Sequence, residues 1–112
     1  MAAGPPRSRT EIRTPMKVLV ELCSFENVIY EFAYTVDVSP HGARVLTKNP
    51  WQSNQHLTLR SVQGNLCSPA RVAYCQSVGG SSFAIGVELH QPAVNWPKPQ
   101  KNSAWLRPQL RT

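Results

Sequence analysis

Hydrophobic and polar positions alternate through the middle of the chain, and the clearest alternation covers residues 30–39. Its larger apolar positions are Tyr30, Phe32, Tyr34, Val36 and Val38. A period of two is the pattern of a β-strand with one buried face. We expect the apolar set to face the core, and the alternate positions, Asp37 and Ser39 among them, to point outward.

Five further segments have strand composition and are bounded by turn residues; they cover residues 16–23, 43–46, 55–61, 66–75 and 83–89. We expect Tyr74 and Phe83 to face inward, whereas Arg44 and Gly86 take outward positions. A glycine inside a strand often marks a place where another group approaches the backbone closely. Six short strands without a long helix predict an all-β fold, a small six-stranded antiparallel β-barrel.

The two ends of the chain differ in composition from the predicted barrel, which spans residues 16–96. Residues 1–15 are rich in Pro, Arg, Ser and Thr and show no periodicity, so we interpret them as a flexible N-terminal arm. Residues 97–112 are polar and basic, and we expect them to form a disordered tail. Just before this tail, residues 92–96 are predicted to form a short helical turn, with Trp96 covering one end of the barrel.

The net charge is +6, from 12 basic and 6 acidic residues. Residues 1–15 contribute +2 and residues 97–112 contribute +4, whereas the residues between them sum to zero. Basic ends favour an anionic partner such as nucleic acid, a nucleotide or a membrane surface. The alternative is that these residues serve only solubility.

Catalytic and metal-binding patterns are absent from the sequence. The three cysteines are an odd number without a Cys-x-x-Cys pair, and the three histidines lie in separate segments without metal-ligand spacing. We therefore expect no enzyme activity, no metal and no cofactor. No apolar run approaches the roughly 18 residues of a membrane span, so we expect no membrane insertion and a cytoplasmic location.

Two arginines in the arm and a polar corner after the longest strand are the candidate binding groups. Arg9 and Arg13 carry planar, permanently charged guanidinium groups, which pair with phosphate or with the edge of guanine. The corner follows the pattern Asp37-x-Ser39-x-x-Gly42. The carboxylate can accept hydrogen bonds from guanine or hold an arginine in place, the hydroxyl can donate to phosphate, and the glycine lets backbone N–H groups approach an anion. Alone, each feature also fits an ordinary solvated arm and an ordinary turn.

In this order, Arg-x-x-x-Arg followed by Asp-x-Ser-x-x-Gly, the two patterns resemble the PilZ domain family. Residues 35–45, 70–74 and 83–89 are similar to the central segment and last two strands of that family, and the resemblance covers about residues 7–96. It implies a six-stranded barrel that binds cyclic di-GMP, a bacterial second messenger. The sequence departs from the family at Ser8, where many members have another arginine, a position associated with the number of bound ligand molecules.

The resemblance also assigns roles to individual residues. Arg9 and Arg13 would clamp guanine and phosphate from the arm. The contacts from the barrel surface would come from Asp37, Ser39, Gly42 and, as a shelf beneath the ligand, Gly86.

The expected function is that of a cyclic di-GMP receptor that relays the signal to an unknown protein partner. One alternative is a protein-interaction module that needs no ligand. Another is a small barrel that binds single-stranded nucleic acid, which requires exposed aromatic side chains among basic residues. Because the aromatic residues are predicted to face inward, the sequence disfavours nucleic acid as a partner.

Overall fold

Antiparallel strands account for most of the fold. The computed structural model describes residues 11–24, 26, 28–93 and 95–97. Its strands are β1 (Thr14–Pro15), β2 (Leu19–Ser24), β3 (Ile29–Ser39), β4 (Gly42–Thr47), β5 (His56–Ser61), β6 (Cys67–Ser77) and β7 (Phe83–Leu89). The six predicted strands are all present, and the two-residue β1 is an addition that the sequence pattern did not indicate.

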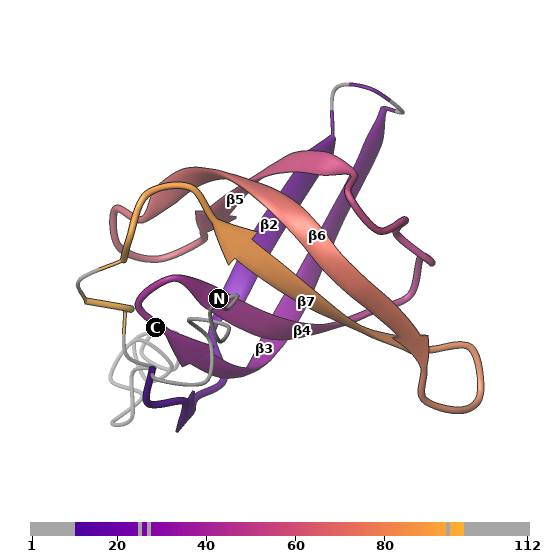
Figure 1. The fold of residues 1–112 in the computed structure, drawn as a ribbon, viewed down its shortest axis with the longest axis horizontal. Helices are drawn as coiled ribbons and strands as arrows, with labels where there is room; N and C mark the ends of the chain where they lie inside the picture. The colour runs from indigo at the N-terminus through magenta and orange to yellow at the C-terminus, as the bar shows by residue number, and fades with distance from the viewer. Residues whose placement is uncertain (1–10, 25, 27, 94, 98–112) are drawn as a thin grey trace, which may run out of the picture.

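Six of the strands form a closed ring in the order β2, β3, β4, β7, β6, β5 and back to β2. All neighbouring strands are antiparallel. In Figure 1 β6 and β7 cross in front of β2 and β3. The buried apolar side chains of all six strands form one core inside the ring. The predicted all-β, six-stranded antiparallel barrel is therefore confirmed. No helix in the described part of the chain is long and apolar enough to cross a membrane.

The end of the barrel near residue 96 is closed by an irregular segment. The described residues between 92 and 97 form no helical turn, so that part of the prediction is wrong. Trp96 is nevertheless buried in the core, as expected, and its indole N–H donates to the Ser39 carbonyl oxygen at 2.8 Å. This bond ties the end of the barrel to the polar corner between β3 and β4.

A β-bulge in β3 reverses the predicted facing of most of that strand. Thr35 pairs with Val45 of β4, but Asp37 pairs with Arg44, so Val36 is an extra residue. A single extra residue moves every later side chain to the other face. After the bulge, Val38 points to the core and Asp37 and Ser39 lie on the outer side of the strand, as expected; both are nevertheless buried.

Before the bulge, the prediction is wrong. The outer face of the strand carries Tyr30, Phe32, Tyr34 and Val36, which are 41–56% exposed. The inward positions are Glu31, Ala33 and Thr35, all buried. Aromatic residues that share one face of an alternating strand ordinarily lie in the core. Here they lie on the surface of the barrel.

Glu31 enters the barrel because three donors meet its carboxylate. The Lys48 backbone N–H, the Asn49 amide and the Trp51 indole N–H donate to it at 2.5, 2.9 and 3.0 Å. Trp51 is only 1% exposed. A buried carboxylate is tolerated where its lone pairs are filled, and this cluster joins β3 to the loop after β4.

A second bulge lies in β6. Val72 pairs with Val87 of β7, but Tyr74 pairs with Gly86, so Ala73 is the extra residue. Tyr74, which was predicted to face inward, therefore points outward and is 38% exposed. Phe83, also predicted inward, is half-buried.

Candidate functional site

A cavity of about 630 Å³ opens on the outer side of β4, β6 and β7, beside the corner between β3 and β4. This volume lies within the range of small-molecule sites, roughly 300–1,000 Å³. Four of the predicted site residues line it: Arg13, Ser39, Gly42 and Gly86. Arg9 lies outside the described residues.

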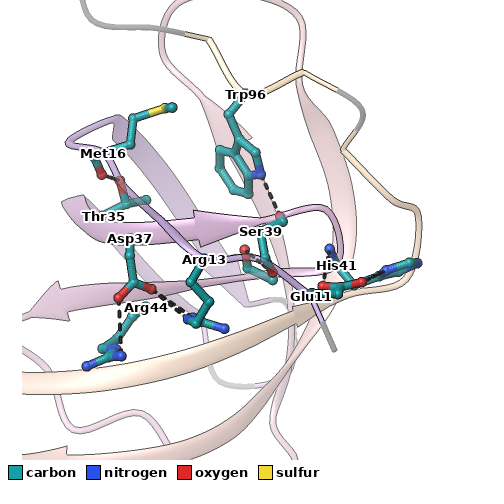
Figure 2. Close-up of polar contacts among 10 residues, drawn as sticks. Glu11, Arg13, Met16, Thr35, Asp37, Ser39, His41, Arg44 and Trp96 are labelled. Carbon is teal, nitrogen blue, oxygen red and sulfur yellow. Dashed lines mark hydrogen bonds and ion pairs between the residues drawn. The ribbon is translucent and has the colours of Figure 1, made fainter. Parts of the chain in front are cut away.

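Asp37 lies behind the arginines that line the cavity. Arg13 donates to its Oδ1 through Nε at 3.0 Å and Nη2 at 2.8 Å, and Arg44 Nη2 lies 3.2 Å from Oδ2 (Figure 2). One carboxylate thus faces two guanidinium groups, which leaves one positive charge uncompensated. Arg44 Nε is buried and has no hydrogen-bond acceptor among the described residues. The cluster is suited to an additional anion.

The arm brings Arg13 to this position by pairing with β3. Thr14 lies opposite Val38 and Pro15 opposite Asp37, and the Met16 N–H donates to the Val36 oxygen at 3.1 Å. Thr35 fills the gap at the bulge, donating to the Met16 oxygen at 2.5 Å and accepting from the Val18 N–H at 2.8 Å. Residues 11–15, which the sequence assigned to the flexible arm, are thus attached to the barrel.

The corner of the site is held by a second contact from the arm. The Glu11 carboxylate bonds the ring Nδ1 of His41 and accepts the His41 backbone N–H at 3.2 Å (Figure 2). Burial alone would raise the pKa of Glu11, but hydrogen bonds from the His41 ring, Ser39 and the His41 backbone together lower it below its ordinary value. Gly42 permits the close approach of β7 to the corner, because a Cβ there would lie 2.8 Å from the Val87 oxygen.

Gly86 forms a flat place on the outer side of β7, and an aromatic ring already lies on it. A Cβ on Gly86 would be 2.2 Å from Cε2 of Tyr74. The bulge at Ala73 aims the ring there, so the two features belong together. The sequence indicated a shelf for a planar ligand at Gly86, and in the structure the ring of Tyr74 occupies that place.

Sequence reasoning did not assign several residues of the cavity. Besides Arg44, these include Glu11, His41, Arg71 and Tyr74. Arg71 bonds the Asn54 side chain at 2.8 Å and pairs with Glu88 of β7. The outward position of Arg44 beside a predicted turn was the available signal. Tyr74 could not be found, because period-two reasoning placed it inside.

The fold and the site together define a small ligand-binding barrel whose cavity presents arginines beside a tight backbone corner. The PilZ domain model matches residues 7–95 of the chain. The chain therefore belongs to the PilZ domain family. Domains of this family are generally receptors for cyclic di-GMP and are binding modules rather than enzymes.

Among solved structures, the Bacillus subtilis inhibitor of motility, MotI/DgrA, has a similar fold. The TM-score is 0.61 at 18% sequence identity, over 80% of this chain and 49% of the other. This chain thus corresponds to about half of that protein, and the likeness supports the barrel fold. None of the curated proteins matched the chain.

Proposed function

We propose that this protein is a receptor that binds cyclic di-GMP in the cavity beside the corner between β3 and β4 and passes the signal to a protein partner. The observation that carries this proposal is the convergence of Arg13 and Arg44 on the single carboxylate of Asp37 at the cavity. A cyclic dinucleotide has two phosphates and two guanine bases, the groups that guanidinium recognises through forked hydrogen bonds and stacking.

Each site residue has a physical role in this proposal. Asp37 orients the two arginines and leaves them short of one negative charge, which a phosphate supplies. Ser39 and the backbone around Gly42 offer hydrogen bonds to the ligand. Tyr74, lying on Gly86, offers a ring for base stacking, which contributes roughly 1–3 kcal/mol per base in comparable sites.

Arg9 completes the site in this proposal. It lies four residues before Arg13 in the sequence, and an extended chain separates such positions by about 13 Å. One arm can therefore reach two parts of a dinucleotide. Fixing the Arg9 side chain on the ligand costs conformational entropy, which charge-assisted hydrogen bonds offset.

Calorimetry with the full chain tests the proposal. We expect cyclic di-GMP to bind in the micromolar range or tighter, about −8 kcal/mol, and cyclic di-AMP, with the same phosphates and other bases, to bind more weakly. Saturation at about 100 times Kd should stabilise the fold by about 2.7 kcal/mol, seen as a higher melting temperature. Absence of both heat and a melting shift at several hundred micromolar ligand would refute the proposal.

Variants locate the site. Arg13→Ala and Arg44→Ala should each weaken binding about 10- to 100-fold, which corresponds to about 1.5–3 kcal/mol for a hydrogen bond to a charged group. Their effect on stability should stay below about 1 kcal/mol, because both pairs with Asp37 are partly open to solvent. Arg60→Ala is the matched control: it is also a strand arginine paired with a carboxylate, Glu21, but it lies away from the cavity.

A further inference from the structure

The outer face of β3 carries an apolar surface that no described segment covers. We call it the aromatic face; its members are Tyr30, Phe32, Tyr34, Val36, Leu46 and Val62, all 41–56% exposed. Tyr34 lies opposite Leu46 of β4 and opposite Leu19 of β2, and the Val62 N–H donates to the Leu19 oxygen. The members therefore lie on β3 and β4 and at the residue after β5, and Leu19 of β2 connects Val62 to Tyr34.

The exposed apolar area of the aromatic face is larger than isolated apolar residues on a protein surface would give. Aromatic side chains present roughly 150–250 Å² each, so the three half-exposed rings alone contribute roughly 230–390 Å². The aliphatic members bring the face into the range of about 300–600 Å² that marks the largest and often functional patch of a monomer. With a polar rim, two such faces in contact bury on the order of 1,200 Å², the lower limit of a stable interface.

The charges of the barrel and of the aromatic face indicate which partner can cover this face. The described residues carry six basic and six acidic side chains, so the barrel itself does not attract a polyanion. On the face, Arg60 is already paired with Glu21, and the Tyr30 hydroxyl also bonds that carboxylate. Residues 98–112 contain Trp105 and Leu106 but also four basic residues, which Lys17 at this face repels.

A second copy of the chain fits where these partners do not. Lys17 lies at the Tyr34 end of the face, with its Nζ 4.7 Å from the Tyr34 ring centroid. Glu26 is exposed in the turn beyond the Tyr30 end. If two faces pack with their β3 strands antiparallel about a two-fold axis near Phe32, Lys17 of each copy lies near Glu26 of its partner.

We propose that the aromatic face is a self-complementary interface through which two copies of this chain form a dimer. The Lys17–Glu26 pairs fix the antiparallel register, and Phe32 lies at the centre, where both copies contribute the same ring. The face adjoins the ligand cavity at β4, since Leu46 is two residues from Arg44. The proposal does not depend on the binding of cyclic di-GMP.

Sedimentation equilibrium of the full chain over roughly 1–300 µM tests the proposal. We expect a monomer–dimer equilibrium with Kd in the micromolar range. Phe32→Ser should weaken it at least 10-fold without lowering the melting temperature, since the side chain is half-exposed. Val78→Ser is the matched control, because Val78 is equally exposed in the β6–β7 hairpin and should leave the equilibrium unchanged.

A charge exchange separates a specific interface from general stickiness. Lys17→Glu and Glu26→Lys should each weaken the dimer about 5-fold or more, and the double variant should restore it. A chain that stays monomeric over the whole range overturns the proposal, as does a dimer that Phe32→Ser leaves intact. If the monomeric chain instead binds a single-stranded oligonucleotide and Phe32→Ser abolishes that binding, the face belongs to nucleic acid.

Discussion

Gly86 carries no side chain, and the Tyr74 ring occupies the space that a methyl group would need. Gly86→Ala should lower stability by about 1–3 kcal/mol, the usual cost of overpacking, because the ring must leave its place. In a Tyr74→Ala background the same change should cost only a few tenths of a kcal/mol, and thermal melts of the four proteins give this coupling.

Gly42→Ala is the contrast for that experiment. Its added methyl group meets the Val87 backbone oxygen at 2.8 Å rather than a side chain. Removing the Tyr74 ring should not relieve its cost. If both glycine variants respond equally to Tyr74→Ala, the contact between Tyr74 and Gly86 is not what makes Gly86 necessary.

At the scale of elements, the Glu11 carboxylate is one of the contacts that attach the arm, beside the β1–β3 pairing and the bonds between Arg13 and Asp37. The pKa of Glu11 in the folded protein lies below its ordinary value of 4.5, because bonds from His41 and Ser39 outweigh the effect of burial. A lowered folded-state pKa means that the contact stabilises the arm above pH 4.5 and is lost as the pH falls through the folded value.

The Met16 amide reports this change, because its N–H bonds β3 just after the arm. Its protection from hydrogen exchange, measured by NMR, should fall as the pH is lowered below 4.5, through the folded-state pKa of Glu11. The Val72 amide, bonded to Gln55 away from the arm, should keep its protection. In Glu11→Gln the Met16 protection should already be low at pH 6 and change little with acid; an unchanged wild-type profile would contradict this role of Glu11.

The strands were predictable from period and turn residues, and the facing of their side chains was predictable only in part. Each bulge adds one residue that alternation cannot reveal, so Tyr34 and Tyr74 were placed on the wrong side. The burial of Glu31 was equally hidden, because its three donors come from residues 48–51 and become partners only in the closed barrel.

The residues of the candidate site were easier to predict from the sequence than the residues of the aromatic face. Arg13, Ser39, Gly42 and Gly86 were proposed from local chemistry and family resemblance, and all four line one cavity. Arg44 and Arg71 were not assigned, because the outward position of a strand arginine, the only signal that Arg44 gave, does not by itself distinguish a binding residue from an ordinary surface residue. Their roles depend on which strands become neighbours, and that follows from the closure of the barrel.

At the scale of the whole molecule, charge is divided between a balanced barrel and basic ends. The excess of six positive charges lies entirely in residues 1–10 and 98–112. Replacing Lys98, Lys101, Arg107 and Arg111 by glutamine should lower the salt concentration that elutes the protein from heparin, because non-specific binding scales with the number of paired charges. The affinity for cyclic di-GMP, measured in about 0.15 M salt, should change less than threefold.

Heparin elution reports non-specific binding by the basic ends, and the affinity for cyclic di-GMP reports specific binding in the cavity. A loss of cyclic di-GMP affinity beyond about tenfold would place the C-terminal residues in the binding site and contradict the division.

The extra residue at Val36 changes which residues of β3 point to the core. Before Val36 the odd-numbered side chains point inward and the even-numbered ones outward, and after it this assignment is reversed. The aromatic face and the polar corner can therefore vary independently, although they share one strand. A redesign that straightens the strand without deleting a residue, so that Val36 takes a partner on β4, would restore strict alternation. It would send either the three rings or the Asp37 and Ser39 pair into the core.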